Sequence, residues 1–151
     1  MADVHEPDAR IEELSNELVV LSARLVRAVR RRHRDVAPAA IRVLSLLDEL
    51  GPSTVSALAE ADRCSQPTMT GLVNGLADRG WVERSPHPGD ARSNLVSMTT
   101  QGRAALDDVR RRNAALVAER ITASGRTPEE LATAVAVLTD VLAAPSGRTH
   151  E

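Results

Sequence analysis

Short polar side chains gather at the start of one predicted helix. Ser65, Gln66, Thr68 and Thr70 follow one another closely, and Asn74 comes one helical turn later. Such side chains at a helix N-terminus can reach base edges, and Ser65 with the first-turn amides can hold a phosphate. Gln66 could pair with an adenine through two hydrogen bonds, and the threonine methyl groups could meet thymine. The plain alternatives are a helix cap for Ser65 and a solvated face for Gln66, Thr68 and Thr70.

A second group that could do chemistry is the pair Asp90 and Arg92, followed by Ser93, in a stretch rich in turn formers. An arginine at a hairpin tip can enter a narrow minor groove, where the potential of DNA is most negative. Asp90 could hold that guanidinium in a fixed fork. The alternative is an exposed ion pair that contributes almost nothing to stability. Arg63 and Arg84 are further candidates, in their case for contact with phosphate.

Motifs for catalysis, metal binding and redox chemistry are weak or missing in the sequence. The four histidines are scattered without metal-ligand spacing, and no Ser-His-Asp order, phosphate-cradling loop or carboxylate pair is found. We therefore expect no enzyme, no metal site and no cofactor. The single cysteine, Cys64, excludes an intramolecular disulfide. Because it lies beside Arg63 at a helix N-terminus, Cys64 could be a redox-sensitive thiol, but we favour a structural thiol.

Length, composition and charge favour one compact domain. The chain has 151 residues, of which 42% are hydrophobic and 26% charged, and these values are ordinary for globular proteins. Trp81 is the single aromatic residue, so leucine, valine, isoleucine and alanine must form the core. No apolar run is long enough for a membrane span, and we expect a cytoplasmic protein. The net charge of −2 argues against nucleic-acid binding, but six arginines and no acid lie between Arg24 and Arg34.

Hydrophobic spacing predicts a mainly α protein with a small β-hairpin wing. Two short helices joined by a tight turn, followed by two strands, form a winged helix-turn-helix pattern. The predicted helices cover residues 8–34, 38–50, 55–61, 65–80, 99–124 and 128–143, and the strands cover 81–85 and 94–98. The first helix carries an apolar seam of the coiled-coil kind, which this chain or a partner subunit must cover. The seam consists of Ile11, Leu14, Leu18, Leu21, Leu25 and Ala28.

Particular residues predict helix ends, one apolar helix face and the hairpin. Thr99 is expected to cap the fifth helix, and Thr127 with Glu130 has the form of a capping box. The turn formers in residues 86–93 predict a long, charged hairpin tip. The second helix is expected to carry Ile41, Leu44, Leu47 and Leu50 on one face.

The stretch 36–106 resembles the MarR family of bacterial transcription regulators. The matching pieces occur in order and at spacings that fit the family. They are PAAIRVL (38–44), VSALA (55–59), SQPTMT (65–70), LADRGWVER (76–84), DARS (90–93) and MTTQGRA (98–104). The resemblance implies one MarR-like domain over 1–151, with a winged helix-turn-helix lobe at 37–100 and a helical dimerisation lobe from 8–35 and 101–144.

The resemblance also implies a function and partners. Family members are homodimers, most often repressors, that bind a pseudo-palindromic operator in double-stranded DNA. In the family, the wing acid and arginine have the roles described above for Asp90 and Arg92. Many members hold small aromatic anions between the dimerisation helices and the winged helix, but this chain lacks Phe and Tyr for ring stacking. The cluster near that junction could attract a small anionic effector or form a solvated basic stripe; it comprises Arg30, Arg31, Arg32 and His33.

Gly71 and Gly75 depart from the family pattern, which often has basic residues in the recognition helix. Each glycine costs about 1 kcal/mol of helix stability relative to alanine and removes a contact. We therefore expect this helix to make few contacts with bases. Sequence recognition would then depend more on the wing and on DNA shape. With the negative net charge, the glycines motivate a second hypothesis: a protein-interaction adaptor that kept the fold without an operator of its own.

Overall fold

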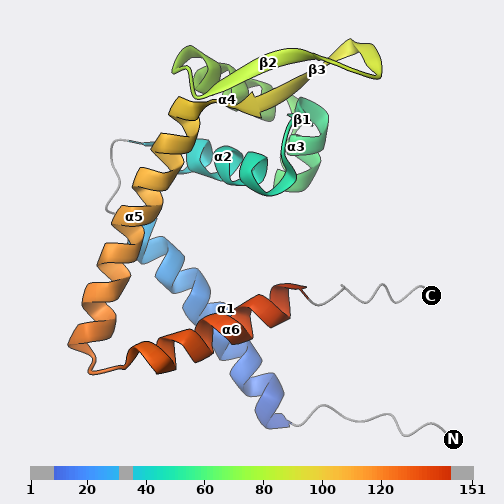
Figure 1. The fold of residues 1–151 in the computed structure, drawn as a ribbon. Coiled ribbons are helices and arrows are strands. Elements are labelled where there is room, and N and C mark those ends of the chain that lie inside the picture. The colour runs from blue at the N-terminus through green and yellow to red at the C-terminus, as the bar shows by residue number, and fades with distance from the viewer. Residues whose placement is uncertain (1–8, 31–35, 144–151) are drawn as a thin grey trace, which may run out of the picture. The chain divides into compact units, whose positions relative to one another are not determined.

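The computed structural model describes residues 9–30 and 36–143 (Figure 1). The helices are α1 (Ala9–Arg30), α2 (Pro38–Leu50), α3 (Val55–Asp62), α4 (Gln66–Asp78), α5 (Thr100–Ala123) and α6 (Pro128–Ala143). The strands are β1 (Ser53–Thr54), β2 (Val82–His87) and β3 (Asp90–Met98). The mainly α fold class and the predicted winged helix-turn-helix are confirmed. Residues 31–35, including most of the predicted basic cluster, lie outside the described residues.

The chain forms two compact units, residues 1–113 and 114–151, so that the division falls inside α5. These units do not coincide with the predicted lobes, whose boundaries stay a prediction. The core of the first unit joins α2, α3, α4, the sheet and the first turns of α5. Seven of its residues have no exposed surface: Val43, Leu44, Leu58, Met69, Val73, Val96 and Leu106. Full burial of one such side chain contributes about 1.5–3 kcal/mol.

Leu50, at the end of the apolar face predicted on α2, lies outside this core. α2 ends at Leu50, and Gly51, with a φ of 73°, turns the chain toward β1. Leu50 therefore remains 54% exposed. Of the other residues predicted on that face, Leu44 and Leu47 are buried and Ile41 is half-buried.

The wing is a hairpin with a much shorter tip than predicted. β2 and β3 pair antiparallel as far as His87 and Asp90, so only Pro88 and Gly89 form the turn. The register shifts between Pro86 and His87. Because β2 is an edge strand in the order β1-β3-β2, the missing N–H of Pro86 is tolerated there. The turn formers that suggested a long loop are thus accommodated by an irregularity and a two-residue turn.

The first turn of α5 is fastened to the chain segment between α4 and β2. The Thr99 hydroxyl accepts from the Gly102 N–H at 3.1 Å, which confirms the predicted cap, and donates to the Gly80 carbonyl at 2.6 Å. The Thr99 N–H donates to the Trp81 carbonyl at 3.1 Å. These bonds bring the α5 backbone against Trp81, and a Cβ on Gly102 would lie 2.1 Å from the Trp81 carbonyl oxygen.

α6 begins with the predicted capping box. The Glu130 N–H donates to the Thr127 hydroxyl at 3.3 Å, and the Thr127 N–H donates to the Glu130 carboxylate at 2.9 Å. The hydrogen bond from the Thr127 N–H is the largest cause that lowers the pKa of Glu130, and the Arg126 guanidinium is the second. The reciprocal bonds satisfy two N–H groups that the helix itself leaves unpaired.

Two helices carry apolar faces that the described residues leave exposed. On α1 the exposed apolar side chains include Ile11, Leu14, Leu21 and Leu25 of the predicted seam. On α6 they are Leu131, Val135, Val137, Leu138, Val141 and Leu142, and α6 buries none of its side chains. Exposed apolar side chains in such number are typical of a surface that is covered by another part of the chain or by another molecule. Within residues 9–30 and 36–143, each helix is too short or too polar to cross a lipid bilayer.

Candidate nucleic-acid interface

The N-terminus of α4 is organised by its own hydroxyl groups. Ser65 caps the helix, as predicted, and its Oγ accepts from the Thr68 N–H at 3.3 Å and lies 2.7 Å from the Thr68 hydroxyl. The Thr70 hydroxyl donates to the Gln66 carbonyl at 2.9 Å. Thr70 can therefore offer DNA its methyl group and an acceptor, but not its hydroxyl proton. Gln66 and Thr68 are exposed, and Thr70 is half-buried.

The exposed surface of α4 lacks side chains near the middle of the helix. Gly71 and Gly75 are exposed, and a Cβ added to either would meet nothing within 4 Å. Neither glycine has a positive φ, so the backbone conformation does not require glycine at these positions. The helix can therefore come close to another surface along this line.

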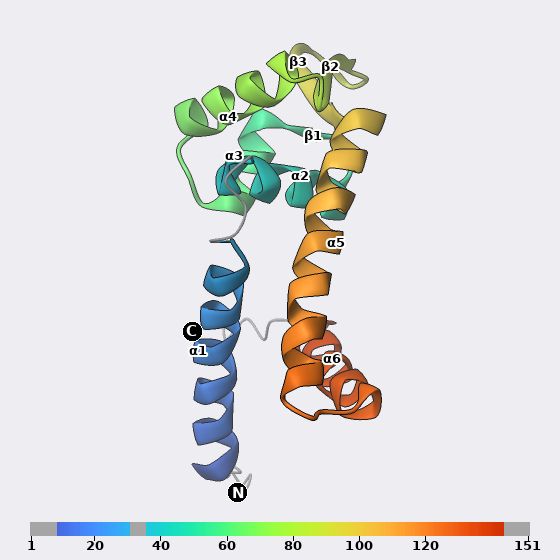
Figure 2. The ribbon, with the colours of Figure 1, turned by 90° about the vertical axis from the view of Figure 1, so that its left-hand side faces the viewer.

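Asn74 and Arg84 are brought together by the packing of the wing strand against α4. Arg84 Nη2 donates to Asn74 Oδ1 at 2.7 Å, and both side chains are exposed. Figure 2 shows α4 and the β2–β3 hairpin at the same end of the first unit. The sequence singled out both residues but gave no sign of this contact, because it depends on how β2 packs beside α4.

The wing acid holds the main chain. Asp90 Oδ1 accepts from the Arg92 N–H at 2.9 Å, instead of forming the fork to the guanidinium that the sequence suggested. The Gly89 N–H similarly donates to His87 Nδ1 at 3.0 Å. These two bonds shape the tight turn, and the Arg92 side chain stands exposed beside it. Ser93, the third predicted wing residue, is half-buried.

Arg63 occupies a backbone conformation that favours glycine. Its φ is 53° and its ψ is 38°, in the left-handed region, and it ends α3 just before α4. A non-glycine residue in this region carries strain of about 1 kcal/mol or more. The side chain itself is exposed. This conformation ends α3, because it lets the Arg63 N–H donate to the Glu60 carbonyl at 3.1 Å.

An ion pair that the sequence did not reveal braces the turn between α3 and α4. Asp62, at the end of α3, has a side chain that is only 3% exposed. Arg42 on α2 donates to both of its oxygens, through Nε to Oδ1 and through Nη2 to Oδ2 at 3.0 Å. This pairing lowers the pKa of Asp62 below its ordinary 3.8. The pair thus joins the end of α3, just before the turn to α4, to α2.

Cys64 lies next to this ion pair. Burial, followed by the neighbouring Asp62 carboxylate, raises the pKa of its thiol, and Sγ donates to the Ser65 carbonyl at 3.6 Å. A redox-sensitive thiol needs the opposite, a lowered pKa. These contacts favour a structural role for Cys64.

Asp62→Asn is expected to lower the free energy of unfolding at pH 7 by about 1–3 kcal/mol, because Arg42 loses its charged partner. Since folding lowers the pKa of Asp62 below 3.8, the contribution is complete above about pH 5 and fades as the pH falls below 3.8. Urea unfolding of wild type and variant between pH 7 and pH 3 measures the difference. Glu60→Gln, an exposed change on the same helix, is the control. A difference that does not change with pH would contradict this assignment.

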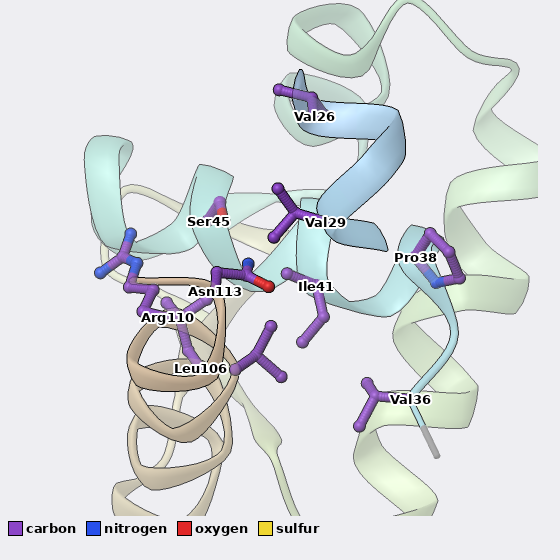
Figure 3. A pocket seen from close by; sticks show the side chains of 10 residues that line it. Val26, Val29, Val36, Pro38, Ile41, Ser45, Leu106, Arg110 and Asn113 are labelled. Carbon is purple, nitrogen blue, oxygen red and sulfur yellow. The ribbon is translucent and has the colours of Figure 1, made fainter. Parts of the chain in front are cut away.

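A cavity of about 250 Å³ lies away from α4 and the wing, still within the first unit. Figure 3 shows polar side chains gathered on one side of it, from Arg110, Asn113 and Ser45. The remaining lining is apolar and comes from Val26, Val29, Val36, Pro38, Ile41, Leu106 and Val109. Arg110 also donates to Asp48 at 2.7 Å. Arg103, and then Arg110, lower the pKa of Asp48, so Arg110 connects the cavity to an ion-pair cluster between α2 and α5.

Comparisons with known proteins agree with this geometry. Residues 37–93 match the sequence profile described as the MarR family. An uncharacterized HTH-type transcriptional regulator of Mycobacterium bovis is 35% identical over 129 residues, which cover 83% of this chain and 87% of that protein. The crystal structure of a putative transcriptional regulator from Pseudomonas aeruginosa has a TM-score of 0.74 and 26% identity, and the match covers 92% of this chain and all of the other.

A further similar structure is that of BpsR from Bordetella bronchiseptica, whose DNA binding is regulated by 6-hydroxynicotinic acid. It has a TM-score of 0.58 and 26% identity, with 93% of this chain and 100% of the other covered. The helix-turn-helix, the wing, the profile match and the extent of the mycobacterial similarity together lead to one conclusion. This chain belongs to the MarR family of DNA-binding transcriptional regulators, which are not enzymes.

Proposed function

We propose that this chain is a cytoplasmic, homodimeric repressor that binds a pseudo-palindromic site in double-stranded DNA. The observation that carries the proposal is the location of α4 and the wing at one end of the first unit (Figure 2), linked by the Asn74–Arg84 bond. A recognition helix in the major groove and a wing in the neighbouring minor groove need this arrangement. In the proposal Ser65, Gln66, Thr68, Thr70 and Asn74 face the major groove.

The wing supplies the second contact of the proposed complex. Asp90 fixes the main chain at Arg92 through a 2.9 Å hydrogen bond, so that the exposed arginine projects from the start of β3, beside the two-residue turn. Such an arginine suits a narrow minor groove. Ser93 lies beside it, and Arg63 and Arg84 supply charge for phosphates.

The exposed apolar faces of α1 and α6 support a homodimer. A second copy offers the same two faces, and a symmetric pair can bury them together. Two α4 helices then enter successive major grooves about 34 Å apart, which accounts for a pseudo-palindromic site.

The cavity supports release of DNA by a small ligand. Its apolar lining and the polar side on which Arg110 lies suit a small anion with an apolar body. A bound anion would share Arg110 with Asp48, which joins α2 to α5. The regulation of BpsR by an aromatic acid is a parallel case, although this chain has no Phe or Tyr to stack against a ring.

Arg92→Ala is expected to weaken binding to the preferred duplex by about ten- to a hundredfold, because an arginine contact with DNA contributes about 1–3 kcal/mol. The duplex is first selected from random sequences, and affinity is then measured by fluorescence anisotropy. Arg120→Ala removes the same charge from an exposed position on α5 and serves as the control. Equal affinities for the Arg92 and Arg120 variants would refute the role of the wing.

The salt dependence of the same titrations tests the proposal as a whole. A protein that neutralises phosphates loses affinity with a log–log slope of roughly −0.9 per contact. The adaptor hypothesis, favoured by the bare face at Gly71 and Gly75 and the net charge of −2, predicts no selected sequence and no such slope.

A further inference from the structure

We propose that Asn74 and Arg84 act as one donor pair that selects guanine over adenine at one position of the operator. The inference rests on the DNA-binding function proposed above and adds a specificity determinant to it. It starts from the 2.7 Å hydrogen bond between Arg84 Nη2 and Asn74 Oδ1.

The chemistry of arginine fixes the orientation of the Asn74 amide. A guanidinium has only donors, so the group that faces it must be the amide oxygen. The amide NH2 group then points away from Arg84, and it carries two N–H donors. Asn74 is exposed on α4, so these donors are available to a molecule that approaches the helix.

The surroundings of Asn74 allow a short side chain to reach a base. Gly71, one turn before it, and Gly75, next to it, are both exposed and bare. Residues three or four apart share a helix face. Because position 71 is a glycine, no side chain there keeps the DNA groove at a distance from Asn74. The glycines thus permit the close approach that an asparagine contact requires.

The pair presents donors and positive charge where an unpaired asparagine would present one donor and one acceptor. Adenine is read through an acceptor and a donor, N7 and N6–H2, and therefore suits an asparagine whose oxygen is unoccupied. Guanine offers two acceptors, N7 and O6. Arg84 occupies one lone pair of Asn74 Oδ1 and places its positive charge beside it, so the amino group of adenine is disfavoured at this position. The two acceptors of guanine match the donors that the pair presents.

The test compares the base preferences of the full-length wild type with those of three variants, Asn74→Asp, Asn74→Ala and Arg84→Gln. For each protein, bound duplexes are selected from a pool of random sequences. Asn74→Asp keeps a partner for Arg84 but replaces the donors with an acceptor. It is expected to lose a guanine preference of about tenfold at one position while the other positions keep theirs. Arg84→Gln removes the charge and is expected to raise tolerance of adenine there. Replacing that guanine with 7-deazaguanine, which lacks the N7 acceptor, is expected to weaken wild-type binding but not binding by Asn74→Ala.

Three results would overturn the inference. Unchanged base preferences in all variants, with wild-type binding intact, would remove it while leaving the proposed function in place. A uniform loss of affinity on every duplex with a shallower salt slope would make the pair a phosphate contact. Failure of the wild type to select any sequence would remove both proposals. Thermal unfolding of each variant, expected to stay near that of the wild type, confirms that the exposed substitutions leave the fold intact.

Discussion

Gly102→Ala is expected to remove more than about 3 kcal/mol from the free energy of unfolding, beyond the usual cost of an overpacked core. A Cβ at Gly102 would lie 2.1 Å from the Trp81 carbonyl oxygen, 2.9 Å from its carbonyl carbon and 3.0 Å from Met98 Cγ. Backbone atoms cannot move aside as a flexible side chain can. The α5 backbone must therefore move away from Trp81. That movement would strain the Thr99 hydrogen bonds with Gly80 and Trp81, which fasten α5 to the chain after α4.

Gly71→Ala is the matched control for this prediction. Its Cβ would meet nothing within 4 Å, and alanine is a better helix former than glycine by about 1 kcal/mol. The variant is therefore expected to be slightly more stable than the wild type. Urea unfolding followed by circular dichroism measures both changes. Similar stabilities for Gly102→Ala and the wild type would show that α5 does not approach Trp81 as closely as described.

Sequence patterns predicted the parts of the fold that depend on neighbouring residues. The Ser65 and Thr99 caps and the Thr127–Glu130 capping box are all present. Each involves residues three apart, where the side chain and the backbone it bonds belong to one helical turn. Local chemistry alone is sufficient to place such features.

The features that sequence patterns missed depend on distant packing. The two-residue strand β1 has no alternation to detect, and it forms because β3 offers an edge to Ser53 and Thr54. The hairpin extends to His87 and Asp90 although turn formers suggested a loop. Turn propensity could not show that an edge strand accommodates Pro86.

The candidate site was predicted in its residue types but not in its connections. The polar residues of α4 and the arginine of the wing were found from their order in the sequence. The Asp90 bond to the Arg92 main chain and the Asn74–Arg84 bond follow from strand register and from the packing of the wing. Both bonds change what the residues can offer to DNA, so the proposed base preference of Asn74 required the structure.

Leu138→Glu is expected to convert the proposed dimer into a monomer and to lower affinity for a duplex with both half-sites by at least about a hundredfold, because two linked half-site contacts gain that much from effective concentration. Leu138 is 37% exposed in the single chain, and its neighbour Val135, one turn away, is 54% exposed. A buried carboxylate in the proposed interface is strongly unfavourable. Light scattering gives the oligomeric state, and anisotropy gives the affinity.

Ala136→Glu provides the control, because it introduces the same charge at an exposed position that lies on the opposite side of α6 from Leu138 by helical geometry. It is expected to remain a dimer with wild-type affinity. The Leu138 variant should keep the wild-type affinity for a duplex with one half-site, since α4 and the wing lie in the other unit and fold on the first core. If the Leu138 variant remains a dimer, or if the wild type is a monomer that binds both half-sites independently, the apolar face of α6 does not join two copies.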